Sequence, residues 1–230
     1  MSPPSALKAV FFDLDDTLVW TSVSRLARAK LAFERVCRDF PTLNCEQLVA
    51  GALEPVGLAV RGVVPVLRET GLLDTEAGRE AQGIWFFRGC YELMSPFEGM
   101  AETVCELANS HGLGVLTNGR EEIQLAKFSH LAVHHEFRWF VSSETAGFEK
   151  PDLGFFQYVL ELTGLQPSEC MLVGDSLEID VSGAKSAGMT AVWFNHRREP
   201  APTAGKGPDF TIFALPELLL NPSLRPGAGS

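Results

Sequence analysis

The chain has 230 residues, 46% of them hydrophobic, and carries a formal net charge of −10 at pH 7. This length and hydrophobic content predict a folded protein with one sizeable core and a smaller lobe, and they exclude a chain that is wholly disordered. The acidic charge argues against a broad surface for nucleic-acid polymers or anionic membranes, and it leaves small ligands open.

The cysteines and the lack of long apolar stretches indicate in which cellular compartment the protein is expected. The five cysteines are odd in number and form no Cys-x-x-Cys pair, which predicts buried thiols in a reducing cytoplasm, with neither a disulfide framework nor a zinc site. They are Cys37, Cys45, Cys90, Cys105 and Cys170. No stretch approaches the roughly 18 apolar residues of a membrane span, and no secretory signal is evident. We therefore expect a cytoplasmic protein.

The first predicted strand, residues 9–13, is apolar and ends in a cluster of acids. In an open α/β sheet, ligands bind outside the carboxyl ends of the strands. The side chains of Asp13 and Asp15 project to the same side of an extended chain, so their carboxylates share a cation, share a proton or hold different roles. The alternative is that Asp15, Asp16 or Thr17 caps the next helix.

Residues 19–96 differ from the rest of the chain in their sequence pattern. Their apolar residues recur at helical spacing, and glycines and prolines interrupt the pattern. The segment lacks apolar runs that end in acids. It is therefore predicted to form an inserted helical unit, whose plainest role is to contribute a core of its own.

A second apolar run, residues 113–117, ends in Thr117, Asn118 and Gly119. The threonine hydroxyl and the backbone N–H groups of the next two residues are donors that suit an anion. Asn-Gly is also a frequent turn sequence, so this motif alone is weak. Arg120 comes next as a candidate substrate contact, with a solvated helix start as the alternative.

Two later motifs add a cation and more acids. Lys150 precedes a helical pattern, where a lone lysine is most often solvated. A third apolar run, residues 170–174, leads directly into Asp175, and Asp180 lies five residues further on. Acids thus follow two separate predicted strands.

Predicted strands and helices alternate along most of the chain. The strands are expected at residues 9–13, 113–117, 139–142, 171–174, 191–194 and 210–212, and the later helices at about 99–110, 121–135, 152–163 and 177–187. This order predicts an α/β fold, a doubly wound parallel sheet with helices on both faces. Residues 221–230, rich in proline, glycine and serine, are expected to form a flexible tail.

Taken in order, the motifs closely resemble the haloacid dehalogenase-like (HAD) superfamily of phosphohydrolases. They are Asp-x-Asp-x-Thr at 13–17, a strand ending in Thr117, Lys-Pro at 150–151 and Gly-Asp-x-x-x-x-Asp at 174–180. The resemblance implies a Rossmann-like catalytic core of residues 1–18 and 97–220, with residues 19–96 inserted as a small helical cap. It also implies that the first strand is central, between the strands of the second and fourth motifs.

The resemblance further implies a role for each matching residue. Asp13 is the nucleophile that accepts a phosphoryl group, and Asp15 is the general acid and base. Thr117 and Lys150 hold the phosphoryl oxygens, and the backbone N–H of Asn118 adds a donor there.

A magnesium site is implied by the same resemblance. The ion is bound by the carboxylates of Asp13 and Asp175 and by the backbone carbonyl of Asp15. Thr17 supports the loop, and Asp180 orients either a water of the metal or Lys150.

The chemistry requires these residue types independently of the family. A phosphate monoester carries about two negative charges at neutral pH, so a carboxylate nucleophile can approach it only when Mg²⁺ and Lys150 screen that charge. Covalent transfer to Asp13 divides one hard step into two. Asp15 protonates the leaving alkoxide and then takes a proton from the attacking water, and neighbouring acids are expected to raise its proton affinity.

An acid at position 15 favours a phosphatase over a dehalogenase, because a halide leaves without a proton. We expect a Mg²⁺-dependent phosphatase that hydrolyses a small phosphorylated metabolite, a nucleotide or a sugar phosphate, as a monomer or a small homo-oligomer. Two alternatives stay open. One is a phosphomutase acting on a sugar phosphate, and the other is a non-catalytic regulatory protein that binds phosphate.

Overall fold

The computed structural model describes residues 6–56, 59–88, 93–200, 207–221 and 224. The chain divides into two compact units, of which the first combines Met1–Val19 with Pro96–Ser230 and the second is Trp20–Ser95. The predicted flexible tail, 221–230, lies outside the described residues apart from 221 and 224.

The first unit is built on a six-stranded sheet in the order β5-β4-β1-β6-β7-β8, and every neighbouring pair is parallel. The strands are β1 (Ala9–Phe12), β4 (Gly112–Thr117), β5 (Phe137–Ser142), β6 (Cys170–Gly174), β7 (Thr190–Phe194) and β8 (Phe210–Ile212). The predicted parallel α/β fold is confirmed, and β1 lies between the strands of the second and fourth motifs.

Alternation along β1 explains how the sheet is covered on both faces. All four residues of β1 are buried. Ala9 and Phe11 belong to the core that also contains the apolar residues of the later helices, whereas the ring of Phe12 lies edge-on to Phe137 at 6.2 Å between centroids. Gly114 on β4 leaves room for the Phe11 ring, since a Cβ there would lie 2.6 Å from it.

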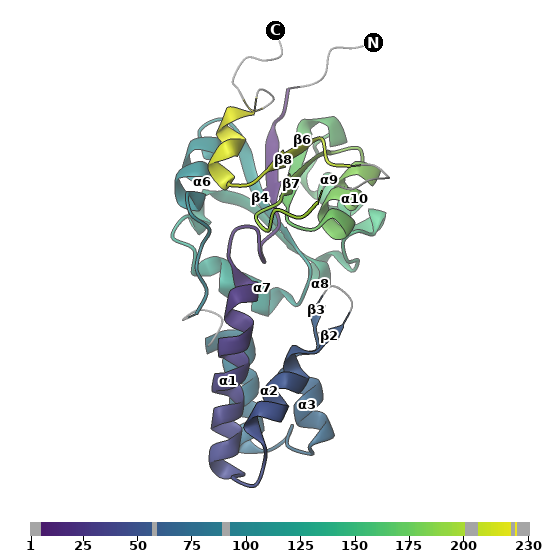
Figure 1. Cartoon of the computed structure of the whole chain (residues 1–230). Coiled ribbons are helices and arrows are strands. Elements are labelled where there is room, and N and C mark those ends of the chain that lie inside the picture. Colours follow the sequence, from purple (N-terminus) through teal and green to yellow (C-terminus); the bar gives the residue numbers. More distant parts are fainter. Residues whose placement is uncertain (1–5, 57–58, 89–92, 201–206, 222–223, 225–230) are drawn as a thin grey trace. The chain divides into compact units, whose positions relative to one another are not determined.

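Helices of the first unit flank this sheet, with α9 and α10 on one side and α6 on the other (Figure 1). They are α6 (Met100–Ala108), α7 (Glu121–Ser129), α8 (Ser143–Ala146), α9 (Leu153–Thr163) and α10 (Ser182–Ser186). Shorter turns are η2 (His134–Glu136), η3 (Pro167–Glu169), η4 (Leu177–Val181) and η5 (Leu215–Leu220). The α9 helix begins where expected because the Asp152 carboxylate caps it, accepting from Gly154 N at 2.7 Å.

Two predicted helices differ from the structure. The helix expected over 121–135 ends at Ser129, and the chain then turns so that Leu131 and Val133 are buried. The helix expected over 177–187 is divided between the π-helical turn η4 and the short α10. In the first segment tertiary burial overrides local helical periodicity, whereas the second segment stays helical with a π-helical first part.

The second unit is mainly helical and has its own core. Its elements are α1 (Thr21–Asp39), α2 (Cys45–Leu53), β2 (Pro55–Val56), β3 (Ala59–Val60), α3 (Val63–Glu69), α4 (Glu76–Gly83) and η1 (Ile84–Arg88). Phe33 and Val36 of α1 pack there with Leu67 and Trp85. The short antiparallel pair β2–β3 was not predicted, because only helices were expected in this segment.

A disulfide corrects the prediction made from the cysteines. Cys37, near the end of α1, is bonded to Cys45, the first residue of α2, with a Cα–Cα distance of 6.2 Å. The two helices pack together, which brings residues eight apart within bridging distance. Cys105 is exposed and Cys170 is a buried thiol, while Cys90 lies outside the described residues.

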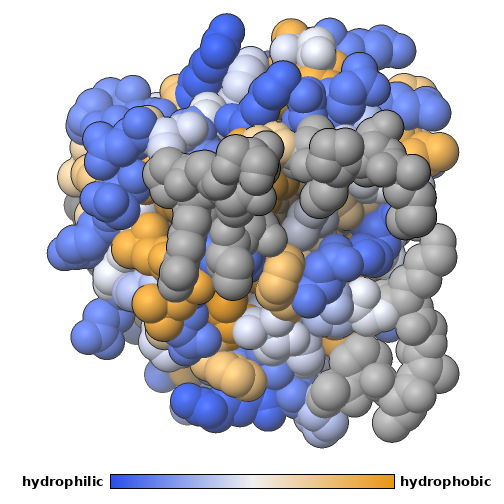
Figure 2. Space-filling model, turned by 90° about the horizontal axis from the view of Figure 1, so that it is seen from above, coloured by the Kyte–Doolittle hydropathy of each residue, from blue (hydrophilic) through white to orange (hydrophobic). Residues whose placement is uncertain are grey.

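The face of the molecule shown in Figure 2 is mostly hydrophilic, with small apolar areas between the polar side chains. Such a surface agrees with the net charge of −10. Among the residues that the structure describes, no helix is both long enough and apolar enough to cross a membrane.

Candidate active site

The predicted site residues converge at the carboxyl ends of three adjacent strands. Asp13 directly follows β1, Thr117 is the last residue of β4, and Asp175 directly follows β6. The backbone N–H of Asp13 donates to the carbonyl of Val173 on β6 at 2.9 Å, so the parallel pairing extends up to the acid. Because parallel strands end at the same edge of the sheet, residues far apart in the sequence meet there.

Lys150 is the buried cation of this site. Its side chain is 1% exposed, and Nζ donates to Asp13 Oδ1 at 2.8 Å, to Asp180 Oδ1 at 2.7 Å and to the Leu116 carbonyl at 2.7 Å. These three acceptors satisfy all three donors of the ammonium group. Burial alone lowers the pKa of Lys150, but the carboxylates of Asp13 and Asp180 outweigh it and raise the pKa above its ordinary value. The amine is therefore charged.

The side chain of Asn118 holds the backbone of Lys150. Its Oδ1 accepts from Lys150 N at 2.8 Å, and its Nδ2 donates to Lys150 O at 2.9 Å. Any contact of Asn118 with phosphate is thus left to its backbone N–H. Gly119 was also expected to offer its N–H to an anion, but that group donates to Ser143 Oγ at 2.9 Å.

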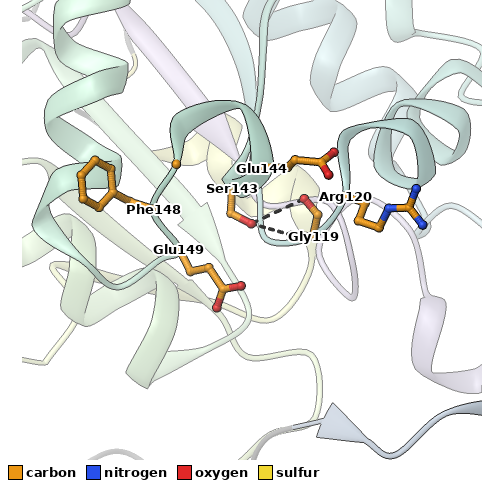
Figure 3. Close-up of a pocket in the computed structure, with 7 residues that line it drawn as sticks. Gly119, Arg120, Ser143, Glu144, Phe148 and Glu149 are labelled. Atoms are coloured by element: carbon orange, nitrogen blue, oxygen red, sulfur yellow. Dashed lines mark hydrogen bonds between the residues drawn. The ribbon is translucent and has the colours of Figure 1, made fainter. Parts of the chain in front are cut away.

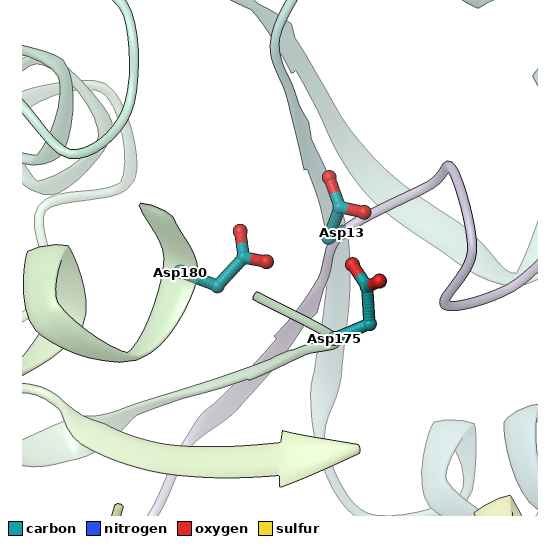
Figure 4. Close-up of side chains that lie close together, drawn as sticks. All are labelled: Asp13, Asp175 and Asp180. Atoms are coloured by element: carbon teal, nitrogen blue, oxygen red, sulfur yellow. The ribbon is translucent and has the colours of Figure 1, made fainter. Parts of the chain in front are cut away.

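Three carboxylates form an acidic cluster beside Lys150. Ligand atoms of Asp13, Asp175 and Asp180 all lie within 4.8 Å of one another, and the side chains point toward a common space (Figure 4). Burial raises the pKa of Asp13 well above its ordinary range, and it raises the pKa of Asp175 to about 7 with help from the charge of Asp180. In both cases burial and the neighbouring acids raise the pKa by more than the adjacent cation lowers it, Lys150 beside Asp13 and Arg197 beside Asp175.

A divalent cation fits this cluster chemically. Carboxylate oxygens are hard ligands that suit Mg²⁺, and a cation would supply further positive charge. The predicted ligands were Asp13, Asp15 and Asp175, and the structure brings the carboxylate of Asp180 to the cluster as well. Gly174 makes this possible, because a Cβ at that position would overlap the Asp180 side chain.

The carboxylate of Asp15 has different neighbours. Lys127 Nζ, on α7, lies 2.8 Å from Asp15 Oδ1 and 2.7 Å from Oδ2, and Gln124 Nε2 of the same helix lies 2.9 Å from Oδ2. Asp15 was expected beside other acids, so the contact with an ammonium group corrects that prediction. The sequence gives one indication that Gln124 and Lys127 are not ordinary surface residues. They are polar, three residues apart and placed between the apolar Ile123 and Phe128, which are buried.

The two threonines predicted in the site are both buried. Thr117 Oγ1 lies 2.6 Å from Gln124 Nε2, at the end of β4. The hydroxyl of Thr17 has no hydrogen-bond partner among the described residues, so its predicted support of the loop stays a prediction.

Arg197, which the sequence analysis did not single out, binds two acids. Its Nη1 donates to Asp175 Oδ2 at 2.9 Å and its Nη2 donates to Asp16 Oδ2 at 2.8 Å. Asp16 has a φ of 59° and thus lies in a tight turn. The alternative that acids of this segment cap the next helix is wrong, because α1 begins at Thr21 and its N-cap is Trp20.

A pocket opens beside the residues that follow β4 (Figure 3). Its lining residues are Gly119, Arg120, Ser143, Glu144, Gly147, Phe148 and Glu149. Gly119 is next to Asn118 in the chain, and Glu149 is next to Lys150. The pocket therefore adjoins Lys150, which contacts the acidic cluster, and Asn118, which holds the backbone of Lys150. Its wall combines an exposed aromatic ring with groups of both charges.

Family comparison agrees with this geometry. A model of haloacid dehalogenase-like hydrolases matches residues 7–188, a span that holds β1, β4 and β6 with all four motifs. The chain belongs to this family. The resemblance stated from the motifs is therefore confirmed, and so is the expectation of an enzyme of the hydrolase class.

Relatives of this HAD-like hydrolase carry phosphatase names. It is 32% identical to the glyceraldehyde 3-phosphate phosphatase of Methanothermobacter thermautotrophicus over 194 residues, 82% of this chain and 86% of that one. It is 27% identical to rat N-acylneuraminate-9-phosphatase over 232 residues, 93% of each chain. Pyrimidine 5'-nucleotidase YjjG of Escherichia coli is 30% identical over 149 residues, 64% of each chain.

Solved structures share the fold. The HAD-hydrolase YfnB of Bacillus subtilis, determined bound to magnesium, superposes with a TM-score of 0.70 at 21% identity, over 94% of this chain and 98% of that one. A 2-haloacid dehalogenase of Pseudomonas syringae has a TM-score of 0.65 at 28% identity, over 93% of this chain and 98% of that one. A dehalogenase thus shares this architecture, so the fold alone does not decide between a phosphatase and a dehalogenase.

Proposed function

We propose that this HAD-like hydrolase is a Mg²⁺-dependent phosphatase that cleaves a small phosphomonoester through a phosphoryl group carried on Asp13. The observation that carries the proposal is the Asp13 carboxylate at the end of β1, in contact with Lys150 and within the acidic cluster. The predicted class, a phosphoric monoester hydrolase, is confirmed by the relatives, which act on phosphomonoesters by name.

Asp15 supports a phosphatase over a dehalogenase. An alkoxide leaving group needs a proton, whereas a halide does not. A carboxyl group two residues after the nucleophile can carry that proton, and Asp15 is 29% exposed, so a ligand can reach it. This chain therefore has the group that ester cleavage requires.

Each residue has a defined task in the proposed reaction. An Asp13 oxygen attacks phosphorus, the bond between phosphorus and the ester oxygen breaks, and Asp15 gives its proton to that oxygen. Lys150 exchanges one of its three present acceptors for a phosphoryl oxygen, and the hydroxyl of Thr117 donates to another phosphoryl oxygen. Asp15 then takes a proton from water, the water oxygen attacks phosphorus, and inorganic phosphate leaves with the Asp13 carboxylate restored.

Asp13 and Asp175 would hold Mg²⁺, together with the backbone carbonyl of Asp15. When bound, the ion neutralises negative charge on the nucleophile and the phosphoryl group. Asp180 contacts Lys150 directly, which favours the role of orienting that lysine. Asp180, the third carboxylate of the cluster, thus has the proposed role of positioning Lys150.

The organic part of the substrate has a candidate site in this protein. We place it against the pocket beside Gly119 and Arg120, whose aromatic and charged lining suits a hydroxylated group such as a sugar. The helical unit Trp20–Ser95 is proposed to act as the cap that selects it. Substrates of this kind are small phosphorylated metabolites, as the names of the relatives indicate.

A substrate panel with one variant tests the function. The panel is glyceraldehyde 3-phosphate, N-acylneuraminate 9-phosphate, a pyrimidine 5'-nucleotide and 4-nitrophenyl phosphate, each with Mg²⁺ and with released phosphate as the readout. We expect turnover by the native protein and none by Asp13→Asn, with Asp209→Asn, an ion-paired acid of β8's preceding loop, as the control. A turnover rate of Asp13→Asn equal to that of the native protein would contradict the mechanism.

The same panel separates the two alternatives. A phosphomutase would return an isomerised sugar phosphate and little free phosphate. A regulatory protein would bind phosphate without turning over any member of the panel.

A further inference from the structure

Lys127 and Gln124 lie on α7, and the proposed chemistry above gives neither of them a task. Lys127 is 6% exposed and Gln124 is 3% exposed. Burying an ammonium group is costly unless a charged partner compensates it. That partner is Asp15, whose two carboxylate oxygens lie 2.8 and 2.7 Å from Lys127 Nζ. The contact joins residues 112 apart in the sequence.

The surroundings of Gln124 fix the orientation of its amide. Nε2 lies 2.9 Å from Asp15 Oδ2, 2.8 Å from the carbonyl of Asn118 and 2.6 Å from Thr117 Oγ1. A carboxylate and a carbonyl only accept hydrogen bonds, so the amide must present its NH₂ group to them. Gln124 Oε1 is buried without a partner among the described residues, which shows what the arrangement costs.

The same amide also contacts the hydroxyl of Thr117 and affects the direction in which that hydroxyl can donate. The amide has two N–H groups for three neighbouring oxygens, so Thr117 Oγ1 can accept only an N–H that it shares with another acceptor. When Thr117 accepts in this way, its own O–H remains available as a donor in another direction. A donating hydroxyl is what a phosphoryl oxygen requires. Gln124 therefore contacts both the proton-carrying acid and the phosphate-binding hydroxyl.

We infer that Lys127 and Gln124 are positioning residues, which hold the carboxylate of Asp15 and the hydroxyl of Thr117 in place for reaction at Asp13. This inference rests on the proposed function and adds to it. One helix face carries both contacts, because residues three apart lie on the same side of α7. A single helix thereby holds both the turn that carries the acid and the end of β4 that carries the hydroxyl.

A simple structural role for the ion pair is the competing explanation. It predicts that removing Lys127 lowers stability and affects the reaction equally whether or not Asp15 is present. A positioning role predicts that the effect on the reaction passes through Asp15. A double-mutant comparison separates the two.

The test uses kcat and KM of the native protein, Lys127→Met, Asp15→Asn and the double variant, with the best alkyl phosphate of the panel. Loss of a general acid and base lowers kcat about 10²- to 10⁴-fold. We expect Lys127→Met to lower kcat roughly 10- to 100-fold with KM changed less than about twofold, and never to exceed the loss from Asp15→Asn. In the Asp15→Asn background, Lys127→Met is expected to cost less than about twofold.

Two further variants sharpen the result. Lys127→Arg should restore part of kcat, because a guanidinium can also contact both carboxylate oxygens. Gln124→Leu should lower kcat in the Asp15→Asn background as well, because its contact with Thr117 does not pass through Asp15. Lys185→Met, which removes an ion-paired lysine of α10 from Asp209, is the matched control and should keep native kcat.

The outcomes are distinct. A native protein inactive on the whole panel contradicts the proposed function. A native level of kcat in Lys127→Met, or an equal loss in both backgrounds, overturns the inference while the phosphatase proposal stands. If Lys127→Met shows no cooperative thermal transition and therefore does not fold, Lys127→Gln, which removes the charge but keeps an NH₂ group as a donor, replaces it with the same expectations.

Discussion

The side chain of Asn118 pairs with both backbone polar groups of Lys150, accepting from its N–H at 2.8 Å and donating to its carbonyl at 2.9 Å. Asn118 follows β4, and Lys150 lies 32 residues later in the loop before α9. The amide therefore fixes the loop from which the Lys150 ammonium reaches Asp13. The side chain of Asn118 thus holds the backbone of Lys150, while the predicted phosphate contact of the Asn118 backbone N–H stays a prediction.

Replacing Asn118 tests this relationship. Asn118→Ala leaves the N–H and the carbonyl of Lys150 without partners, which should lower the free energy of unfolding by about 2 kcal/mol and lower kcat. Asn118→Asp keeps the acceptor and loses the donor, so its loss should be smaller. Urea denaturation and steady-state kinetics measure both. Native stability in Asn118→Ala would contradict the account.

Lys150→Met removes the cation between two buried acids. Asp13 and Asp180 then lack compensation, and the metal-free protein should lose about 3 to 5 kcal/mol of stability. Adding Asp180→Asn should restore part of it, because one of the two charges is gone. Urea denaturation of the single and double variants in EDTA is the measurement. An additive loss in the double variant would show that the pair is not coupled.

Gly174→Ala should displace Asp180, because the new Cβ would overlap that side chain. We expect kcat to fall at least about tenfold, since both Lys150 and the acidic cluster depend on Asp180. Gly83→Ala, at a helical glycine with open space around its Cβ position, is the control and should retain native kcat. A fully active Gly174→Ala would contradict the assigned place of Asp180.

The acidic cluster predicts the pH dependence of stability without metal. Burial raises the pKa of Asp175 to about 7, so at intermediate pH the folded chain holds a proton that the unfolded chain has lost. The stability from this group is present below its unfolded pKa of about 4, and it is lost as the pH rises through about 7. The difference in unfolding free energy between the native protein and Asp175→Asn should therefore decrease from pH 5 to pH 8.

Mg²⁺ should reverse this trend. Metal ligands must be deprotonated, so added Mg²⁺ should raise the Tm of the native protein more at pH 8 than at pH 5. Asp175→Asn should show little response at either pH. Thermal unfolding with and without Mg²⁺ measures this, and an equal rise at both pH values would count against a metal site at Asp175.

Much of the fold followed from local sequence patterns. Apolar runs that end in acids or hydroxyls marked β1, β4 and β6, and the family resemblance placed β1 between the other two. Asp13, Thr117 and Asp175 could be assigned to the carboxyl edge of the sheet because each ends or directly follows its strand. These are statements about short segments, where sequence periodicity is most informative.

Contacts between distant segments could not be predicted in the same way. Asp15 and Lys127 are 112 residues apart, and nothing near either residue shows that they meet. The same holds for Arg197 with Asp16. The bridge between Cys37 and Cys45 joins residues only eight apart, but it depends on how α1 packs against α2, which the cysteine spacing does not show. The polar side chain of Gln124 on an apolar helix face was the one local indication of these contacts. It does not show which residues Gln124 contacts.

Trapping the phosphoryl group on Asp13 tests the central claim most directly. In Asp15→Asn with 4-nitrophenyl phosphate and Mg²⁺, the nitrophenolate leaves without needing a proton, while attack by water lacks its base. We predict a burst of nitrophenolate equal to the enzyme concentration, and borohydride reduction of the acid-quenched protein should convert residue 13 to homoserine. A native enzyme that turns over, together with a phosphoryl group on another residue or on none in Asp15→Asn, would contradict the account.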